Sequence, residues 1–399
     1  MVRPVLADEI LFKECIFYLR EDLYKKKQGN VSEDNQQTYS CISTTFLITK
    51  PWVFEDFTIH PSKVTNFPYA RQAILNFVEN PKWIERFSIY PPQLFGEVLS
   101  SIISFITLRS VKSPRGDDLR VLKIISIENI PEDLRTRLSF TLTFLHAGPG
   151  CINTYLGQEK EEKYISEIKA LLKILKELKE SDYNFVLEVL RLIQLSILSK
   201  RDDLGEAYLL LISALEAVSQ KAVKRKTIKH PKESIWEEKA KDDELFKELL
   251  TEYKDIRGRD KYLGDRFVDF LLKYSPVSCW EEIIEDRDEY GFQISHGDLR
   301  IQHPRDMNQD ELRNILKNAY RYRSEFVHQG AQPPHSYNTS NSNKFFEASF
   351  SEECPIDVRF HSGGPLISSE YVEISPKYEF MLGLAKHAIL NWLNFKLKR

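Results

Sequence analysis

The stretch Asn318-Ala-Tyr-Arg-Tyr-Arg-Ser-Glu-Phe-Val-His-Gln-Gly330 is predicted to be the C-terminal half of an amphipathic helix. Upstream, Asn308 and Glu311 have the spacing of a capping box, which places the helix start near residue 309. Gly330 is the residue type that most often follows a helix end. The pattern therefore predicts one helix, from about Gln309 to His328, with a histidine in its last turn.

The predicted helix has one apolar face. This face is a stripe at helical spacing formed by Leu312, Ile315, Leu316, Ala319, Tyr322 and Phe326. At about 100° per residue, Arg321, Ser324 and His328 fall on the opposite face. Arg323 falls within the apolar stripe, where a guanidinium is costly to bury unless a carboxylate pairs with it.

One carboxylate is placed to pair with Arg323. The run Ala207-Tyr-Leu-Leu-Leu-Ile-Ser-Ala-Leu-Glu-Ala-Val218 is predicted to be a core helix, and Glu216 is its single acidic residue. We expect Glu216 and Arg323 to pair between two packed helices, which would hold the guanidinium at the base of a site. The alternative is that Arg323 reaches water along its aliphatic stem.

Arg323 and His328 are separated by four residues, and these two residue types suit the cleavage of RNA. A guanidinium stabilises charge on the phosphate, and an imidazole transfers a proton near neutral pH. RNA supplies its own nucleophile, the 2′-hydroxyl, so such a site needs no metal ion. The spacing alone is not specific, because Arg225 and His230 repeat it in a basic segment without an apolar period.

The two predicted helices together resemble a HEPN domain, in particular its ApeA-like branch. The resemblance rests on residues 207–218 and on Tyr-Arg-Ser-Glu-Phe-Val-His-Gln-Gly at 322–330, and it extends from about Asp182 to the C-terminus. It implies a helical bundle with an arginine and a histidine at a helix end. Many such domains are metal-independent endoribonucleases that dimerise around a shared cleft. They include toxins, CRISPR-associated nucleases and anti-phage effectors, and some relatives are inactive.

The resemblance also assigns roles. Arg323 and His328 match the motif, and Ser324 matches its small polar residue. Glu216 matches the acidic residue of the first core helix. It implies that Arg323, helped by Arg321, holds the scissile phosphate. His328 would protonate the leaving 5′-oxygen while the same histidine of a second copy accepts the 2′-proton, so we expect a homodimer.

A basic segment leaves the end of the Glu216 helix. It could grip an RNA backbone through Lys224, Arg225, Lys226 and Lys229, since clustered cations release counterions from phosphates. The favoured alternative is a solvated helix exit whose charges face Glu233, Glu237 and Glu238.

Composition narrows the classes of function. The net charge of −3 over 399 residues means that any affinity for RNA must come from a local patch. The five cysteines are scattered and form no C-x-x-C pair, which predicts neither a metal site nor a cofactor and fits a reducing cytosol. No apolar run approaches 18 residues and no signal peptide is recognisable, so we expect a cytoplasmic protein outside the membrane.

We predict an α+β protein with two domains. Residues 1–150 would form a mixed α/β domain, a candidate sensor of a ligand or partner that activates the rest. Residues 151–399 would form an all-α HEPN-like bundle with a β segment inserted at about 331–376. The strands expected in the first part are Ser43–Thr49, Phe54–Ile59, Leu119–Ile127 and Leu138–Leu145, with a helix over Pro68–Glu79 and either state over Gln93–Ile106.

The second part is predicted to be helical. Besides the two motif helices, the expected helices are Glu159–Leu178, Asn184–Leu198, Leu245–Ile256, Tyr262–Tyr274 and Tyr378–Leu397, and the expected inserted strands are Phe345–Phe350 and Leu366–Ile374. Two functions remain open: an endoribonuclease acting as a toxin or anti-phage effector, and an inactive dimerisation or binding module of HEPN type that senses a ligand or partner.

Overall fold

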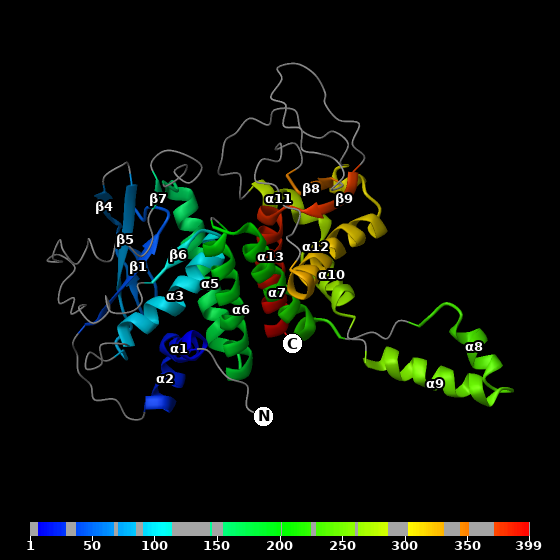
Figure 1. The fold of residues 1–399 in the computed structure, drawn as a ribbon. Coiled ribbons are helices and arrows are strands. Elements are labelled where there is room, and N and C mark those ends of the chain that lie inside the picture. Colours follow the sequence, from blue (N-terminus) through cyan, green and yellow to red (C-terminus); the bar gives the residue numbers. More distant parts are fainter. Residues whose placement is uncertain are drawn as a thin grey trace, which may run out of the picture.

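The computed structural model describes the chain except residues 1–6, 29–36, 68–70, 85–90, 114–143, 146–154, 201, 225–228, 260–261, 286–301, 331–343, 351–370 and 399. The described residues form an α+β protein, with an antiparallel sheet in the N-terminal part and helices dominating the C-terminal part (Figure 1). The predicted fold class is therefore confirmed.

The sheet is built around strand β5 (Arg71–Glu79). Its strand order is β2-β3-β5-β1-β6, and β4 and β7 also pair with β5. Every pairing between these strands is antiparallel. The remaining strands are β1 (Tyr39–Thr44), β2 (Trp52–Val53), β3 (Thr58–Ile59), β4 (Lys63–Phe67), β6 (Val111–Lys112) and β7 (Phe144–Leu145).

The predicted helix over Pro68–Glu79 is wrong, because its described residues form β5. This strand is buried on both faces: Ala73, Ile74, Leu75, Phe77 and Val78 are fully buried. A strand of this kind is a continuous apolar run, which periodicity cannot distinguish from a buried helix.

The strand predictions around it were partly right. β1 begins and ends earlier than the predicted Ser43–Thr49. The predicted Phe54–Ile59 is strand only at its end, because the chain turns between β2 and β3. Residues 119–127 lie outside the described part, and only Phe144–Leu145 of the predicted Leu138–Leu145 is described, as β7.

Three helices accompany the sheet: α1 (Ala7–Ile16), α2 (Glu21–Gln28) and α3 (Pro91–Thr107). The ambiguous segment Gln93–Ile106 is therefore helical, and α3 lies across the sheet between it and the remaining helices (Figure 1).

The C-terminal helices pack side by side beyond α3, except α8 and α9, which stand apart (Figure 1). All the helices predicted there are present, with shifts at some ends. They are α5 (Gln158–Glu177), α6 (Glu180–Ser199), α7 (Leu204–Ala222), α9 (Glu244–Arg259), α10 (Leu263–Tyr274), α12 (Gln309–Gln329) and α13 (Tyr378–Leu397). Two short helices were not predicted, α8 (Glu233–Lys239) and α11 (Trp280–Glu285).

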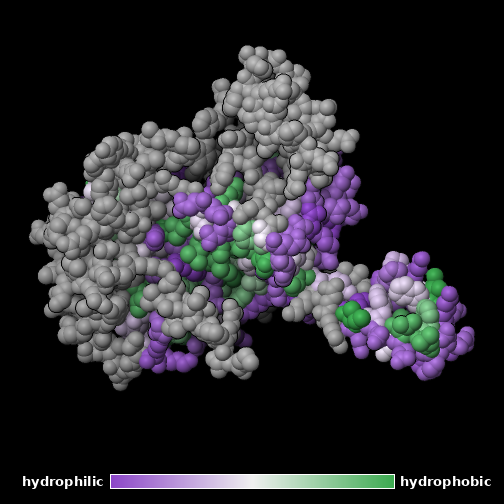
Figure 2. Space-filling model, in the orientation of Figure 1, coloured by the Kyte–Doolittle hydropathy of each residue, from purple (hydrophilic) through white to green (hydrophobic). Residues whose placement is uncertain are grey.

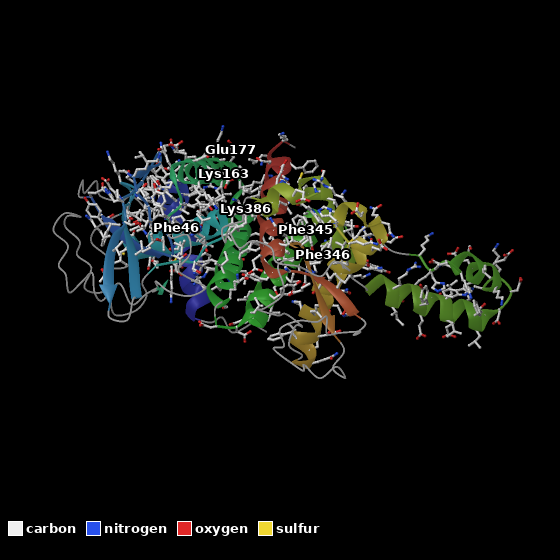
Figure 3. All side chains as sticks on the ribbon, turned by 90° about the horizontal axis from the view of Figure 1, so that it is seen from above. Phe46, Lys163, Glu177, Phe345, Phe346 and Lys386 are labelled. Carbon is white, nitrogen blue, oxygen red and sulfur yellow. The ribbon has the colours of Figure 1, made fainter. Side chains whose placement is uncertain are left out.

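The predicted inserted β segment is an antiparallel hairpin of β8 (Phe346–Phe350) and β9 (Tyr371–Pro376). An aromatic cluster fastens it to α11 and α13, because Phe345 and Phe346 pack around Phe380 and Trp280 (Figure 3). The ring centroids of Trp280 and Phe380 are 4.9 Å apart. This cluster sets the hairpin beside α12, which β9 contacts.

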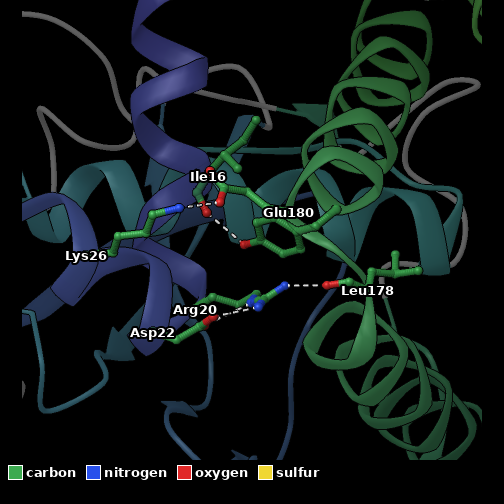
Figure 4. Close-up of polar contacts among 7 residues, drawn as sticks. Ile16, Arg20, Asp22, Lys26, Leu178 and Glu180 are labelled. Carbon is green, nitrogen blue, oxygen red and sulfur yellow. Dashed lines mark hydrogen bonds and ion pairs between the residues drawn. The ribbon is translucent and has the colours of Figure 1, made fainter.

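One continuous hydrophobic core extends from the sheet into the bundle. Polar contacts also join the two parts (Figure 4): Tyr183 donates to the Ile16 carbonyl at 2.7 Å, and Arg20 donates to the Leu178 carbonyl at 2.8 Å. The boundary predicted near residue 150 lies among residues outside the described part, so the two-domain division stays a prediction. None of the helices in the described segments combines the length and the apolar character that crossing a membrane requires.

Candidate functional site

The helix that carries the motif, α12, is capped at both ends as predicted. The Asn308 side chain accepts from the Glu311 amide at 2.9 Å, and the Glu311 carboxylate accepts from the Asn308 amide at 2.9 Å. At the other end Gly330 adopts φ 70°, and its amide donates to the Phe326 carbonyl at 3.0 Å. The caps fix where the helix stops, and therefore where His328 is presented.

The ion pair predicted between Glu216 and Arg323 is present. Arg323 Nη2 lies 3.3 Å from Glu216 Oε2, which joins α12 to α7. The side chains are 22% and 10% exposed, so the guanidinium keeps a path to solvent whereas the carboxylate is nearly buried. The expectation of a pair between packed helices is confirmed.

The pair is held loosely. Glu216 Oε1 accepts from Gln220 at 3.1 Å, but Glu216 Oε2 accepts no hydrogen bond of good geometry from the described residues. Arg323 Nε donates to Ser213 Oγ at 3.5 Å, which is long for a hydrogen bond. The guanidinium is therefore positioned by charge while much of its donor capacity is left for a further acceptor.

A groove of about 810 Å³ lies between the start of α10 and α12. The α12 side is lined by Asn314, Lys317, Asn318, Tyr320, Arg321 and Ser324, and the α10 side by residues 262–265. Gly264 permits the close approach of these helices, since a Cβ there would lie 3.2 Å from the Tyr320 ring. Burial and the charge of Glu216 raise the pKa of Tyr320, while Arg323 opposes the shift, so Tyr320 lies beside the ion pair.

Arg321 has contacts that the sequence did not reveal. Its guanidinium binds the Glu373 carboxylate of β9, and its Nε lies 3.2 Å from Glu325. Tyr322 donates its hydroxyl to the same Glu373 oxygen at 2.5 Å. Arg321 was expected to help hold a phosphate, but its charge is already compensated, and it fastens α12 to the hairpin. Glu373 is 52 residues away in sequence, so no local pattern could have identified it.

His328 and Ser324 differ in surroundings. His328 is exposed in the last turn of α12 and has no hydrogen bond with the described residues, whereas Ser324 is half-buried in the groove. Arg323 and His328 are five positions apart, about 7.5 Å along the axis and about 140° around it. The two groups of one chain therefore do not point toward one common spot.

The basic segment is only partly described. Lys224 and Lys229 are exposed, and Arg225 and Lys226 lie outside the described residues. Glu233 binds Arg257 and Glu237 binds Lys254 at 2.6 Å, and both of these partners belong to α9. The charge of Lys229 also acts on Glu233 and Glu237. The alternative in which the basic charges face Glu233, Glu237 and Glu238 stays a prediction, because Arg225 and Lys226 lie outside the described residues.

Within the described part of the chain, no group of three or more His, Cys, Asp or Glu side chains could hold a metal ion. No protein-family model, no curated protein and no solved structure matches this chain. The resemblance to HEPN domains therefore rests on the sequence motifs alone and stays a prediction.

Proposed function

We propose that this chain is a metal-independent endoribonuclease of HEPN type whose site forms between two copies. The observation that carries the proposal is the Glu216–Arg323 pair, which holds a partly exposed guanidinium at 3.3 Å on the helix that ends in an exposed His328. A guanidinium with spare donors can stabilise the charge that develops on a phosphate, and a free imidazole can move a proton.

The proposed reaction is attack of the 2′-oxygen on the adjacent phosphorus. Arg323 stabilises the pentavalent phosphorane, and His328 gives a proton to the leaving 5′-oxygen. The His328 of a second copy takes the proton from the 2′-hydroxyl. The products are a 2′,3′-cyclic phosphate, or its hydrolysis product, and a 5′-hydroxyl end.

The geometry of α12 supports the need for two copies. Arg323 and His328 of one chain diverge by about 140° around the helix. A two-fold axis near the end of α12 would bring the arginine of one copy and the histidine of the other into one cleft. In this proposal Ser324 contacts the substrate from the groove, and Arg321 keeps α12 in place through Glu373.

A cytoplasmic toxin or anti-phage effector is the role that fits such an activity, with the N-terminal part sensing an activating ligand or partner. The second candidate is an inactive binding module of the same fold. It is favoured by one observation: Arg321 and Arg323 are both paired with carboxylates, so neither guanidinium is fully free.

The deciding experiment is cleavage of a mixed RNA pool in EDTA. Wild type is compared with His328→Ala and with Gln329→Ala, a neighbouring exposed residue that serves as the matched control, at equal concentrations checked for oligomeric state. EDTA-resistant cleavage by wild type and Gln329→Ala, lost in His328→Ala, is the expected result. Equal cleavage by all three would show that the activity comes from a contaminant or another site and not from His328. No cleavage by an intact dimer would favour the binding module.

A further inference from the structure

The hairpin of α8 and α9 stands apart from the rest of the molecule (Figure 1). The side of α8 and the side of α9 that face each other are held together by contacts within the hairpin. Trp236 stacks on His230 with centroids 4.3 Å apart and meets Tyr253 edge-on at 5.3 Å, and Leu250 is buried. With the two ion pairs from α8 to Arg257 and Lys254, these contacts complete a small unit that we call the arm.

The outer side of the arm is apolar and uncovered. Leu245, Leu249 and Ile256 of α9 are 68%, 55% and 66% exposed. Ile235 of α8 is 52% exposed. Of the eight large apolar side chains that are exposed among the described residues, these four lie on the arm, whereas the others are scattered. Figure 2 shows the corresponding hydrophobic surface on the arm. Such clustering on one short element is typical of a docking surface.

The three leucine and isoleucine side chains of α9 form one stripe. At about 100° per residue, Leu245, Leu249 and Ile256 fall within about 40° of one another, the arrangement of a helix that packs on another helix. The stripe extends over 11 residues, about 16 Å. It is a second face of α9, distinct from the one that packs on α8.

Unpaired carboxylates border this stripe on one side. Glu252 lies within it, and Glu248 and Asp255 flank it; all three are exposed and have no ion pair with a described residue. The three cations of α9 whose side chains are described have other partners. Lys247 lies 3.2 Å from Glu244, and Lys254 and Arg257 bind α8. The free surface is thus apolar with an acidic margin.

We propose that the outer face of the arm binds an amphipathic helix of a partner protein whose apolar stripe is flanked by lysine and arginine. The carboxylates beside the apolar stripe indicate that the partner is positively charged. Carboxylates repel the phosphates of RNA and of anionic lipids, so neither is the occupant. A basic helix pairs with Glu248, Glu252 and Asp255 while its apolar face covers Leu249 and Ile256.

A second copy of the arm is a poor occupant. Pairing two α9 stripes buries Glu252 against apolar side chains or against the other Glu252, with no cation to compensate it. The proposal does not depend on ribonuclease activity, so it stands or fails separately from it.

The test uses the full-length chain and two fluorescent probe peptides with the same leucine spacing, one flanked by lysine and one by glutamate. Fluorescence anisotropy is expected to show binding of the lysine peptide alone, weakened at least about tenfold in Leu249→Ser/Ile256→Ser. Thr251→Ala, an exposed residue on the far side of α9, is expected to bind like wild type. Glu252→Lys/Asp255→Lys is expected to prefer the glutamate peptide.

Other outcomes would overturn the proposal. They are absence of binding by the lysine peptide, equal binding by the glutamate peptide, and undiminished binding to Leu249→Ser/Ile256→Ser. A lower molar mass of that variant in light scattering would identify the face as a contact between copies. If the protein binds RNA or anionic vesicles and the same substitutions abolish that binding, the partner is a nucleic acid or a membrane and not a basic helix. Circular dichroism shows whether the exposed substitutions leave the fold intact.

Discussion

Two arginine–glutamate pairs in this molecule differ in how tightly they are held and in how much water reaches them. Arg191 of α6 lies 2.6 Å from Glu97 of α3, with side chains only 11% and 6% exposed, and its Nη1 also donates to Gln194 at 2.7 Å. Arg323 of α12 lies 3.3 Å from Glu216, and its side chain is twice as exposed, 22%.

The difference in burial and contact distance separates a pair that stabilises the fold from a pair that could bind a ligand. The Arg191 pair joins the helix on the sheet to the bundle, with short contacts and the Phe12 ring 5.2 Å from the guanidinium carbon. The Arg323 pair has longer contacts and a path to water. A deeply buried arginine with short contacts holds the fold, whereas one with longer contacts and access to water can exchange part of its pairing for a ligand.

Removing the deeper pair is expected to have the largest effect. Arg191→Ala removes the cation paired with the buried Glu97 carboxylate, and we expect a loss of about 3–5 kcal/mol in the free energy of unfolding. Urea denaturation measures it. Glu97→Gln/Arg191→Met should recover much of the loss, because no charge then remains buried. A loss below about 1 kcal/mol in Arg191→Ala would show that this pair is no more structural than the other.

Arg323→Ala is expected to affect activity more than stability. We expect RNA cleavage to fall about 100-fold, equivalent to about 2.7 kcal/mol in the barrier. The free energy of unfolding should fall by about 2 kcal/mol, less than in Arg191→Ala, because the Arg323–Glu216 contact is longer and Gln220 still donates to Glu216. Single-turnover cleavage and denaturation on the same samples separate the two effects. Destabilisation as large as that of Arg191→Ala, with cleavage proportional to the folded fraction, would make Arg323 structural.

Glu373→Gln tests the role given to Arg321. The substitution weakens acceptance from both Arg321 and Tyr322, and we expect a loss of about 1.5 kcal/mol in the free energy of unfolding. Cleavage should stay within about threefold of wild type, because Arg321 acts on the helix and not on the phosphate. A 100-fold loss of cleavage in a stably folded variant would instead indicate that Arg321 contributes to catalysis.

Gly330→Ala is expected to have the smallest effect. The residue adopts φ 70°, so a Cβ costs about 1 kcal/mol, although no atom of the described residues lies within 4 Å to clash with it. Thermal denaturation should show the loss, and Gly330→Asn should restore part of it, because asparagine tolerates this conformation better. An unchanged melting temperature in Gly330→Ala would mean that the helix end carrying His328 frays without affecting global stability.

Much of the motif region could be predicted because its determinants are local. The capping box at Asn308, the glycine at 330 and the apolar spacing between them define α12, and the bounds predicted for α13 were confirmed. The Glu216–Arg323 pair was predictable for a further reason: each residue is a charge on an otherwise apolar helix face, and burial leaves such charges few ways to be compensated.

Other features depended on neighbours distant in sequence. The segment Arg71–Glu79 is a strand because β1, β3, β4 and β7 all pair with it, and nothing within it excludes a helix. The contact of Arg321 with Glu373 required the β8–β9 hairpin to be placed beside α12 by an aromatic cluster. The arm is similar: the apolar spacing in α9 predicted a helix, but only the fold shows which of its faces is left uncovered.

The sequence by itself determined the long helices of the C-terminal part, the caps of α12 and the residue types of the candidate site, because hydrophobic period and capping act within a few turns of chain. The tertiary structure decided which arginine is deeply buried with short contacts and which keeps longer contacts and a path to water. The difference depends on how closely packing brings the acceptors to each guanidinium and how much water it excludes. These quantities are set by the approach of whole helices, which no short stretch of sequence encodes.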